Sequence, residues 1–289
     1  METILPLLKE AEEFLVQHGI ENPRLNAEEL LGFVLKRDRC SIYLDCLTLS
    51  TRDSEKYKEL LTKRASHVPL QHLLGTQQFR DVELFVGPGV FIPRPETELM
   101  GTYLDDLIRL NGLNTFKCLE IGTGTGAIPL SLVQEHPEGN CVALDVSSSA
   151  CEWAEKNFAK YPELNPQITL IQMDCKDFYS SDRFDFVISN PPYIPKGLIP
   201  TLPKEVRDSD PLLALDGGDD GLEVIRKIAD GCHNWLKPGG WLLLEIGEDQ
   251  GEEVVRLLKS KSFSQISVKP DLTERDRFVV AKWDTSCKN

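Results

Sequence analysis

The sequence predicts an α/β protein in which a seven-stranded, mostly parallel sheet carries helices on both faces. A small helical bundle and a β-hairpin are expected before the sheet. The chain has 289 residues, more than most single domains contain, so we expect two domains. The first 66 residues have the apolar spacing of helices. From about residue 115 strand-like and helix-like segments alternate, which is typical of βαβ units.

The N-terminal segment, residues 1–66, has a helical pattern throughout. Its first apolar side chains recur every three or four positions, at Leu5, Leu8, Ala11, Phe14 and Leu15. Asn26, followed three positions later by Glu29, resembles a capping box and predicts that a second helix begins there. A third amphipathic stretch runs from about residue 53 to residue 66. We therefore expect a helical-bundle domain over residues 1–66.

A different pattern follows over residues 67–92. Apolar residues alternate around glycines and Pro88 as far as Val90-Phe91-Ile92, which predicts a β-hairpin that links two domains. The next segment, Pro93-Arg94-Pro95-Glu96-Thr97-Glu98, is expected to open a helix, because carboxylates such as Glu96 and Glu98 are favourable in a first turn. The second domain is expected over residues 93–289.

Alternating strands and helices define this second domain. The predicted strands cover residues 116–121, 141–146, 168–173, 184–189, 240–246, 263–268 and 278–283. The predicted helices cover residues 126–135, 148–160, 221–236 and 249–259. Only a short turn region, residues 270–276, separates the last two strands. We therefore expect these two strands to form an antiparallel hairpin at one edge of the sheet.

Composition limits the classes of function. The net charge is −14, and nearly all of it falls after residue 80. Such acidity disfavours nonspecific contact with a phosphate backbone, so no direct nucleic-acid binding is expected. No apolar run is long enough to span a membrane, and no signal peptide is visible, so we expect a cytoplasmic location. The eight cysteines include no Cys-x-x-Cys pair, which predicts free thiols and no metal site.

A glycine-rich loop follows the first strand of the alternating region. In Gly122-Thr123-Gly124-Thr125-Gly126 the glycines allow a tight turn and a close approach of a ligand to the backbone. Asp145 stands nineteen residues after Gly126 at the end of the next predicted strand, where a carboxylate can accept both hydroxyls of a ribose. NAD and S-adenosylmethionine both fit this pattern. In the second case Asp174, at the end of the third strand, suits a contact on the adenine side.

The tetrapeptide Asn190-Pro191-Pro192-Tyr193 ends the fourth predicted strand. Because neither proline can donate to a sheet ladder and each restricts the residue before it, a rigid turn is expected. A planar NH₂ group could donate one hydrogen to the Asn190 side-chain oxygen and the other to the Pro191 carbonyl, with the Tyr193 ring stacked on its plane. This turn is expected at the same sheet edge as the glycine loop. That placement favours methyl transfer to nitrogen over hydride transfer.

Further motifs narrow the family. Four more motifs accompany the glycine loop and the Asn-Pro-Pro-Tyr turn, in the order of one known protein family: Gly75–Phe79, Phe91–Glu98, Asp216–Leu222 and Asp271–Val279. With these motifs the chain resembles the release factor glutamine methyltransferases (the HemK/PrmC family), a branch of the class I S-adenosylmethionine-dependent methyltransferases. The resemblance covers essentially the whole chain, including the helical N-terminal domain.

The resemblance implies a specific reaction. The family methylates the side-chain amide nitrogen (N5) of the glutamine in the Gly-Gly-Gln motif of class I peptide chain release factors, supporting translation termination, and leaves S-adenosylhomocysteine as the second product. The helical domain would then dock part of the protein substrate. Without such a role, that domain would be a stabilising cap.

The resemblance also assigns residues. The expected cofactor contacts are Gly122, Thr123, Gly124, Thr125, Gly126, Asp145, Asp174, Cys175 and Asn190. The expected catalytic residues are Asn190, Pro191 and Tyr193, and the expected substrate contacts are these three with Pro192, Phe91, Arg94 and Glu96. Cys175 stands where many relatives have an aromatic residue, which leaves the packing of the adenine open on that side.

Three alternatives use much of the same sequence. An adenine-N6 methyltransferase acting on DNA or RNA would use the same amino-group chemistry, but it normally brings a basic surface and a recognition domain. Methylation of a glutamine in another protein would need the same residues. A non-catalytic adaptor built on a degenerate methyltransferase fold would not need the glycine loop, Asp145 and the Asn-Pro-Pro-Tyr turn together.

Overall fold

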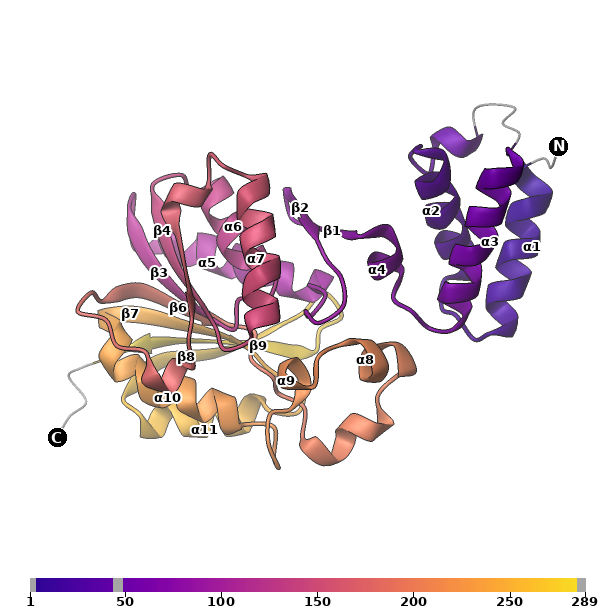
Figure 1. Ribbon diagram of the computed structural model, residues 1–289. Helices are drawn as coiled ribbons and strands as arrows, with labels where there is room; N and C mark the ends of the chain where they lie inside the picture. Colours follow the sequence, from indigo (N-terminus) through magenta and orange to yellow (C-terminus); the bar gives the residue numbers. More distant parts are fainter. Residues whose placement is uncertain (1–3, 44–48, 285–289) are drawn as a thin grey trace. The chain divides into compact units, whose positions relative to one another are not determined.

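The computed structural model describes residues 4–43 and 49–284, which form two compact units (Figure 1). The first unit extends to Thr76 and also contains the short segment Pro203–Ser209. The second unit comprises Gln77–Leu202 and the chain from Asp210 onwards. The chain therefore leaves the second unit once and returns to it.

The first unit is a bundle of helices. Its elements are α1 (Ile4–Gln17), α2 (Pro23–Leu35), the 3₁₀ turn Ser41–Tyr43, α3 (Thr51–Ala65), α4 (Leu70–Leu74) and α8 (Lys204–Ser209). The core of the bundle holds fully buried side chains from α1, α2 and α3, among them Leu8, Leu30 and Tyr57. The Tyr57 hydroxyl donates to the Ala27 carbonyl at 3.0 Å. The three helices expected in residues 1–66 are present.

The second of these helices does not begin where the sequence pattern predicted. It starts at Pro23, with Asn26 already inside its first turns, because proline is preorganised for the first helical position. The Asn26 amide donates to the Glu21 and Asn22 carbonyls at 3.0 Å. It caps the preceding turn instead of opening a helix, so the capping-box prediction was wrong.

Buried Arg64 explains why a segment far along the chain belongs to the first unit. Its Nε donates to Asn26 Oδ1 at 2.7 Å, and its Nη1 donates to the Val68 carbonyl at 2.9 Å. Its Nη2 lies 2.6 Å from Glu205 Oε2 in α8. This ion pair between distant parts of the chain carries no local sequence signal.

The β-hairpin consists of β1 (Thr76–Phe79) and β2 (Val82–Phe85). Its apolar side chains Phe79, Val82 and Leu84 are buried in a core cluster of the second unit, so the hairpin is part of that unit's packing. Two other details differ from the prediction for residues 67–92. Residues 70–74 form the helix α4, and residues 90–92 lie outside any strand.

The second unit is built on a seven-stranded sheet. Its strands are β3 (Phe116–Ile121), β4 (Gly139–Asp145), β5 (Ile168–Gln172), β6 (Phe184–Ser189), β7 (Leu236–Glu245), β8 (Phe263–Pro270) and β9 (Asp276–Trp283). They lie in the order β5-β4-β3-β6-β7-β9-β8. The first five are parallel to one another, whereas β9 is antiparallel to both of its neighbours, β7 and β8. The predicted fold class, including the terminal antiparallel hairpin, is confirmed.

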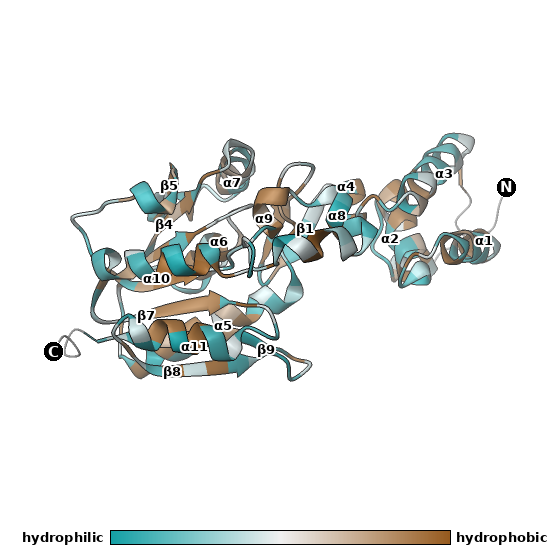
Figure 2. Ribbon diagram, turned by 90° about the horizontal axis from the view of Figure 1, so that it is seen from below, coloured by the Kyte–Doolittle hydropathy of each residue, from teal (hydrophilic) through white to brown (hydrophobic). Residues whose placement is uncertain are grey.

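Helices cover both faces of this sheet. One core cluster joins the sheet to α5 (Glu98–Leu110), α6 (Ala127–Glu135) and α7 (Ser148–Lys160). The other joins it to α10 (Glu223–Trp235) and α11 (Gly251–Ser260). In Figure 2 the strand β7 is coloured as hydrophobic, whereas α10 and α11 carry both kinds of residue, as expected for helices that bury one side. None of the helices in the described residues has the length and apolarity needed to cross a membrane.

The remaining short elements lie in connections of the second unit. They are the helix α9 (Leu212–Leu215) and the 3₁₀ turns Pro95–Thr97, Asn165–Gln167, Cys175–Asp177 and Lys196–Thr201. The last of these turns and α9 belong to the long connection between β6 and α10, which the sequence pattern left without assigned structure.

The strand order creates one switch point. From β3 the successive strands β4 and β5 are added on one side, and the chain then returns to place β6 on the other side of β3. The order of strand addition therefore changes direction at β3. Ligands of open α/β sheets bind outside the carboxyl ends of the strands at such a point. The loops that follow β3 and β6 are the glycine loop and the Asn-Pro-Pro-Tyr turn. The topology therefore brings together the two motifs that stand about seventy residues apart in the sequence.

Candidate active site

The glycine loop needs glycine at three positions. Gly122, Gly124 and Gly126 have φ values of 78°, 57° and 78°, in the left-handed region that other residues adopt only with strain. The loop is tied to the neighbouring strand, because the N–H groups of Gly122 and Thr123 both donate to the Leu144 carbonyl, at 2.8 and 2.9 Å. Nothing lies within 4 Å of the position that a Gly124 side chain would occupy, so the backbone there can be approached.

A buried helix side chain holds this loop from behind. Asn157 of α7 donates to the Thr125 carbonyl at 2.9 Å and to the Phe85 carbonyl at 3.0 Å, and its oxygen accepts from the Phe85 N–H at 2.7 Å. One fully buried amide therefore fixes both the glycine loop and the end of the β-hairpin. This role of Asn157 could not be seen in the sequence.

The sequence interpretation also missed Glu120, the last but one residue of β3. It is 1% exposed, and no described residue donates a hydrogen bond to its Oε2. Burial raises the pKa of its carboxyl group to about 8, and nearby Asp145 adds to the increase. A buried carboxylate with a free oxygen beside a ligand-binding loop is suited to a cationic group of a ligand. Its position two residues before Gly122, the first residue of the glycine loop, was the available signal.

Asp145 stands at the end of β4 as predicted and lies against the glycine loop. One of its oxygens accepts the Gly124 N–H and the other the Ser147 N–H, both at 2.9 Å. Burial raises the pKa of Asp145, while these backbone hydrogen bonds oppose the increase. Each oxygen keeps a second lone pair for another donor. The carboxylate is therefore oriented by the loop and can still accept hydroxyl groups.

Two exposed apolar residues follow neighbouring strand ends. Val146 comes directly after β4 and is 49% exposed, and Met173 comes directly after β5 and is 39% exposed. The Met173 N–H donates to the Asp145 carbonyl at 2.8 Å, so both residues adjoin Asp145. Side chains of this kind at a ligand-binding edge can pack on a flat ring. Neither was among the predicted site residues.

Asp174 and Cys175, which follow Met173 in the chain, lie in different surroundings. Asp174 caps the 3₁₀ turn Cys175–Asp177, accepting the Lys176 N–H at 3.0 Å. That hydrogen bond is the main reason why the pKa of Asp174 is lowered. The thiol of Cys175 is buried in the apolar cluster on the α10 and α11 face of the sheet, and burial raises its pKa to about 11. Its expected contact with a cofactor stays a prediction.

The Asn190–Tyr193 turn lies beside the glycine loop. The Asn190 carbonyl is 4.0 Å from the position that a side chain at Gly122 would take, and Ser189 Oγ donates to the Ile121 carbonyl at 2.6 Å. The Asn190 side chain points its nitrogen to Thr97 Oγ1 at 3.2 Å. No described residue donates a hydrogen bond to its Oδ1. This arrangement leaves the amide oxygen available to an incoming NH₂ group.

A second glycine-rich segment, Asp216–Leu222, supports this turn. The Ile194 N–H donates to the Leu215 carbonyl at 3.1 Å, and the Gly217 N–H donates to the Ile194 carbonyl at 2.9 Å. A side chain at Gly221 would come within 2.3 Å of the Tyr193 carbonyl. Gln250, the residue directly before α11, also donates to that carbonyl, at 2.9 Å. The motif is thus explained by close packing of two backbone segments.

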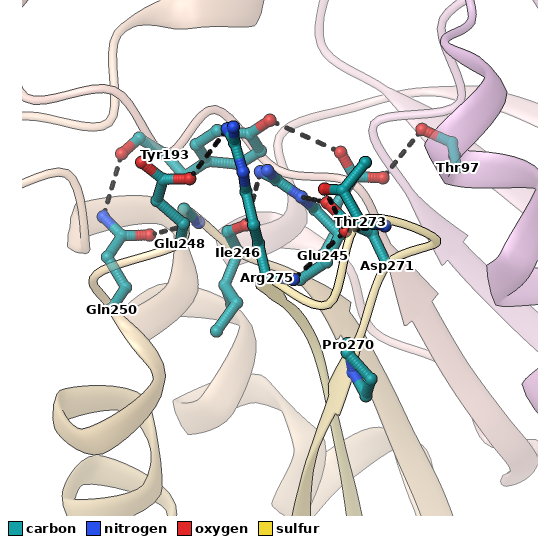
Figure 3. A network of polar contacts seen from close by, with 12 residues as sticks. Thr97, Tyr193, Glu245, Ile246, Glu248, Gln250, Pro270, Asp271, Thr273 and Arg275 are labelled. Atoms are coloured by element: carbon teal, nitrogen blue, oxygen red, sulfur yellow. Dashed lines mark hydrogen bonds and ion pairs between the residues drawn. The ribbon is translucent and has the colours of Figure 1, made fainter.

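Tyr193 is directed into a buried polar network (Figure 3). Its hydroxyl donates to Glu245 Oε1 at 3.4 Å, and the Thr97 hydroxyl donates to Glu245 Oε2 at 2.7 Å. Burial raises the pKa of Glu245 to about 7. Arg277, which donates to the Ile246 carbonyl at 3.2 Å, lies close enough to lower that pKa in part. The sequence interpretation singled out neither Glu245 nor Arg277 as site residues.

The segment before α5 contains the three remaining candidates. The Arg94 guanidinium lies 4.9 Å from the centroid of the Phe91 ring and forms an ion pair with buried Asp210 at 2.6 Å. Glu96 is exposed in the 3₁₀ turn Pro95–Thr97. In this segment the residue with a bond to the Asn190–Tyr193 turn is Thr97.

One acidic cluster of the second unit has a structural explanation. Asp105, Glu135 and His136 bring their ligand atoms within 4.8 Å of one another. Arg80 already places a cation there, since its Nη2 lies 2.9 Å from Asp105 Oδ2 and 2.6 Å from Glu135 Oε2. Asp105 Oδ1 also lies within hydrogen-bond distance of His136 Nε2, at 2.7 Å. The cluster is therefore a polar network around Arg80 that joins the β-hairpin segment to α5 and α6.

Comparison with known proteins covers both units. A family model described as the PrmC N-terminal domain matches residues 6–75, and one described as the methyltransferase small domain matches residues 98–199. The release factor glutamine methyltransferase of Moorella thermoacetica is 38% identical over 96% of this chain and 98% of its own length. The chain belongs to the release factor glutamine methyltransferase family. The resemblance noted in the sequence motifs is thereby confirmed.

Other relatives agree in length and name. The release factor glutamine methyltransferase of Streptomyces coelicolor is 34% identical over 98% of this chain and 99% of its own length. The release factor glutamine methyltransferase of Geobacter sulfurreducens is 34% identical over 96% of this chain and 95% of its own length. Similarity to solved structures is weaker: a ribosomal protein L11 methylase from Lactobacillus delbrueckii has a TM-score of 0.45 and 18% identity, covering 68% of this chain and 82% of that one.

Proposed function

We propose that this chain transfers a methyl group from S-adenosylmethionine to the side-chain amide nitrogen of the glutamine in the Gly-Gly-Gln motif of class I release factors. The observation that carries the proposal is the placement of Asn190 Oδ1, free of donors from the described residues, at the switch point beside the glycine loop. Full-length similarity to release factor glutamine methyltransferases supports the choice of substrate.

The residues at the β3 and β4 ends fit S-adenosylmethionine. This ligand carries an ammonium group, a sulfonium group, a ribose and an adenine. Buried Glu120, with its free oxygen, fits a cationic group of the ligand, and Asp145 fits the ribose hydroxyls. The backbone of Gly122 and Gly124 allows close approach. Val146 and Met173 offer apolar surface for the adenine, and we include Asp174 on that side as predicted from the sequence.

The Asn190–Tyr193 turn would bind the glutamine. The NH₂ group has two hydrogens, and the Asn190 side-chain oxygen and the Pro191 carbonyl supply two acceptors. The Tyr193 ring, whose hydroxyl is held by Glu245, would flank the amide plane. Pro192 keeps the turn rigid, and Phe91, Arg94 and Glu96 would line the approach. Of these, Arg94 is itself fixed by Asp210 and the Phe91 ring.

The chemistry follows from these contacts. An amide nitrogen is a poor nucleophile because its lone pair is delocalised into the carbonyl. S-adenosylmethionine supplies, when bound, an electrophilic methyl group on a sulfonium. Two acceptors on the NH₂ group favour loss of the delocalisation and fix the nitrogen in one orientation. Orientation of this kind contributes several kcal/mol, roughly, to the rate. Once the nitrogen has taken the methyl group it carries a positive charge and still holds both hydrogens. This cationic N-methylated amide is acidic enough to lose one proton to solvent, so the proposal assigns no general base.

The first unit would dock a part of the release factor outside the glutamine loop. A single glutamine gives little specificity, so additional contacts are needed to select one protein. Because this substrate acts in translation, the proposal places the enzyme in the cytoplasm. The chain's acidity, with a net charge of −14, supports a protein substrate over a nucleic acid.

A transfer assay with competing substrates tests the proposal. The protein is incubated with methyl-labelled S-adenosylmethionine and, separately, with a purified class I release factor, DNA or RNA. We expect label on the release factor alone, and none on a release factor whose Gly-Gly-Gln glutamine is replaced by alanine. Label on DNA or RNA would instead support adenine methylation. Label on the substituted release factor would refute the proposed site of methylation.

A further inference from the structure

Three residues from separate parts of the chain form a hydrogen-bonded series beside the Asn190–Tyr193 turn, here called the substrate turn. Figure 3 shows the Thr97–Glu245 part of this series. Thr97 precedes α5, Asn190 follows β6, and Glu245 ends β7. Thr97 is 5% exposed and Glu245 is 2% exposed. Asn190 Nδ2 lies 3.2 Å from Thr97 Oγ1, which in turn lies 2.7 Å from Glu245 Oε2. The series links a substrate-facing amide to a carboxylate that is closed off from solvent.

The direction of each hydrogen bond follows from the number of donors. An ionised carboxylate only accepts, so the single hydroxyl hydrogen of Thr97 must go to Glu245. Thr97 Oγ1 can then only accept from Asn190. The group of Asn190 that faces Thr97 is therefore its NH₂, and its oxygen must face the opposite way. A protonated Glu245 could instead donate to Thr97 Oγ1, and the Thr97 hydroxyl could then donate to the Asn190 oxygen. In that case the Asn190 amide could adopt the inverted orientation, with its oxygen towards Thr97.

We infer that Thr97 and Glu245 are positioning residues that hold the Asn190 amide with its oxygen towards the substrate. The inference rests on the proposed function, in which that oxygen accepts a hydrogen bond from the glutamine NH₂. An inverted Asn190 would present its own NH₂ to the substrate NH₂, placing two donors against each other. The orientation of one amide thus decides whether the site can bind its substrate productively.

The same carboxylate also reaches the other side of the substrate turn. Tyr193 donates to Glu245 Oε1 at 3.4 Å, so one oxygen of Glu245 contacts Tyr193 directly, whereas the other is linked to Asn190 through Thr97. The charged and titratable groups that face Glu245 are Arg277, Tyr193 and Glu96. Arg277 favours the ionised carboxylate, whereas Glu96 opposes it. Burial is the dominant influence and raises the pKa of Glu245 to about 7.

Substitutions of Thr97 separate the hydroxyl from the shape of the side chain. Thr97→Val keeps the volume but removes the acceptor, and Thr97→Ser keeps the hydroxyl. We expect Thr97→Val to lower kcat on the release factor about tenfold, the effect of roughly one lost hydrogen bond. The KM for S-adenosylmethionine should stay within about twofold in both variants, and Thr97→Ser should retain most of kcat, within about threefold.

Substitution of Glu245 tests the role of the ionised carboxylate. Glu245→Gln keeps the shape but adds a donor, so it permits the inverted Asn190 at every pH. In the natural protein kcat should rise as the pH increases through about 7, because Glu245 becomes ionised and locks the amide. Glu245→Gln should lower kcat about tenfold and remove this rising limb from the pH profile.

The outcomes are distinguishable from a failure of the proposed function. If the natural protein methylates no release factor, the proposed function fails, and the inference fails with it. If the natural protein is active, three results overturn the inference alone. They are a Thr97→Val variant with natural kcat, a Thr97→Ser variant as impaired as Thr97→Val, and a Glu245→Gln variant with an unchanged pH profile. Calorimetric binding of S-adenosylmethionine to each variant confirms that it is folded.

Discussion

Gly221→Ala probes the link between the Asp216–Leu222 segment and the substrate turn. Gly221 has a φ of 75°, and an added Cβ would lie 2.3 Å from the Tyr193 carbonyl oxygen and 2.6 Å from Gln250 Nε2. Gln250 itself holds that carbonyl at 2.9 Å. The new methyl group would therefore push against a hydrogen bond that fixes the end of the Asn190–Tyr193 turn.

The size of the effect follows from these distances. Ordinary van der Waals contact of a Cβ begins near 3.4 Å, so the Tyr193 carbonyl must move by about 1 Å. A misplacement of about 1 Å can reduce a rate about 10²-fold when orientation carries the catalysis. We expect kcat/KM for the release factor to fall by that factor. The left-handed backbone of an alanine should additionally reduce the free energy of unfolding by about 1–2 kcal/mol.

Two control variants separate the displacement from backbone strain. Gly239→Ala places an alanine at a φ of 82° with its nearest neighbour, Lys282 Cε, at 3.7 Å, so it should lose similar stability and keep its activity. Gly197→Ala meets nothing within 4 Å and should change neither. Steady-state methylation of a purified release factor and chemical denaturation supply the two measurements. Near-natural kcat/KM in Gly221→Ala would refute the claim that this packing positions the turn.

Three further predictions concern single carboxyl and amide groups. Asn190→Ala should reduce methyl transfer about 10²-fold or more while calorimetry shows nearly unchanged affinity for S-adenosylmethionine; near-natural turnover would contradict the assigned acceptor. Glu120→Gln should weaken that affinity roughly 10- to 100-fold by removing a charge-assisted contact. Because the pKa of Glu120 is about 8 in the free protein, a cationic ligand should expel a proton at pH 7. Titrations in buffers of different ionisation enthalpy should detect this release, and equal release from the variant would contradict it. Finally, the folded-state pKa values of Glu120 and Glu245, about 8 and about 7, are raised above an ordinary glutamate. Their contribution to stability is therefore complete below about pH 4.5 and is lost as the pH rises to about 8. The slope of Tm against pH over this range should be shallower in Glu120→Gln, and an identical slope would be inconsistent with a buried titrating Glu120.

The sheet domain could be predicted well because its signals are local. The predicted strands 116–121 and 184–189 coincide with β3 and β6, and the predicted helix 148–160 coincides with α7. Buried strands and amphipathic helices are defined by periodicity within a few residues. The terminal antiparallel hairpin followed from the short connection between its strands. The glycine loop and the Asn190–Tyr193 turn were recognisable because glycine and proline restrict the backbone in ways that few other residues do.

The missed features depend on contacts between distant segments. Arg64 and Glu205 are 141 positions apart and Thr97 and Glu245 are 148 apart, so no window of sequence shows either pair. The failed capping box at Asn26 has a similar cause. Its oxygen is occupied by buried Arg64 at 2.7 Å, and Pro23 had already begun the helix. Local propensity was overruled there by tertiary contacts.

The position of the transferred methyl group tests the central claim most directly. After reaction of the protein with S-adenosylmethionine and a purified class I release factor, peptide fragmentation by mass spectrometry locates the modification. The binding of an NH₂ group by Asn190 and Pro191 predicts one added methyl group on the side-chain nitrogen of the Gly-Gly-Gln glutamine, with a yield about 10²-fold lower at short reaction times when Asn190 is replaced by alanine. A methyl group on another residue of the release factor, or an unchanged yield from Asn190→Ala, would contradict the account.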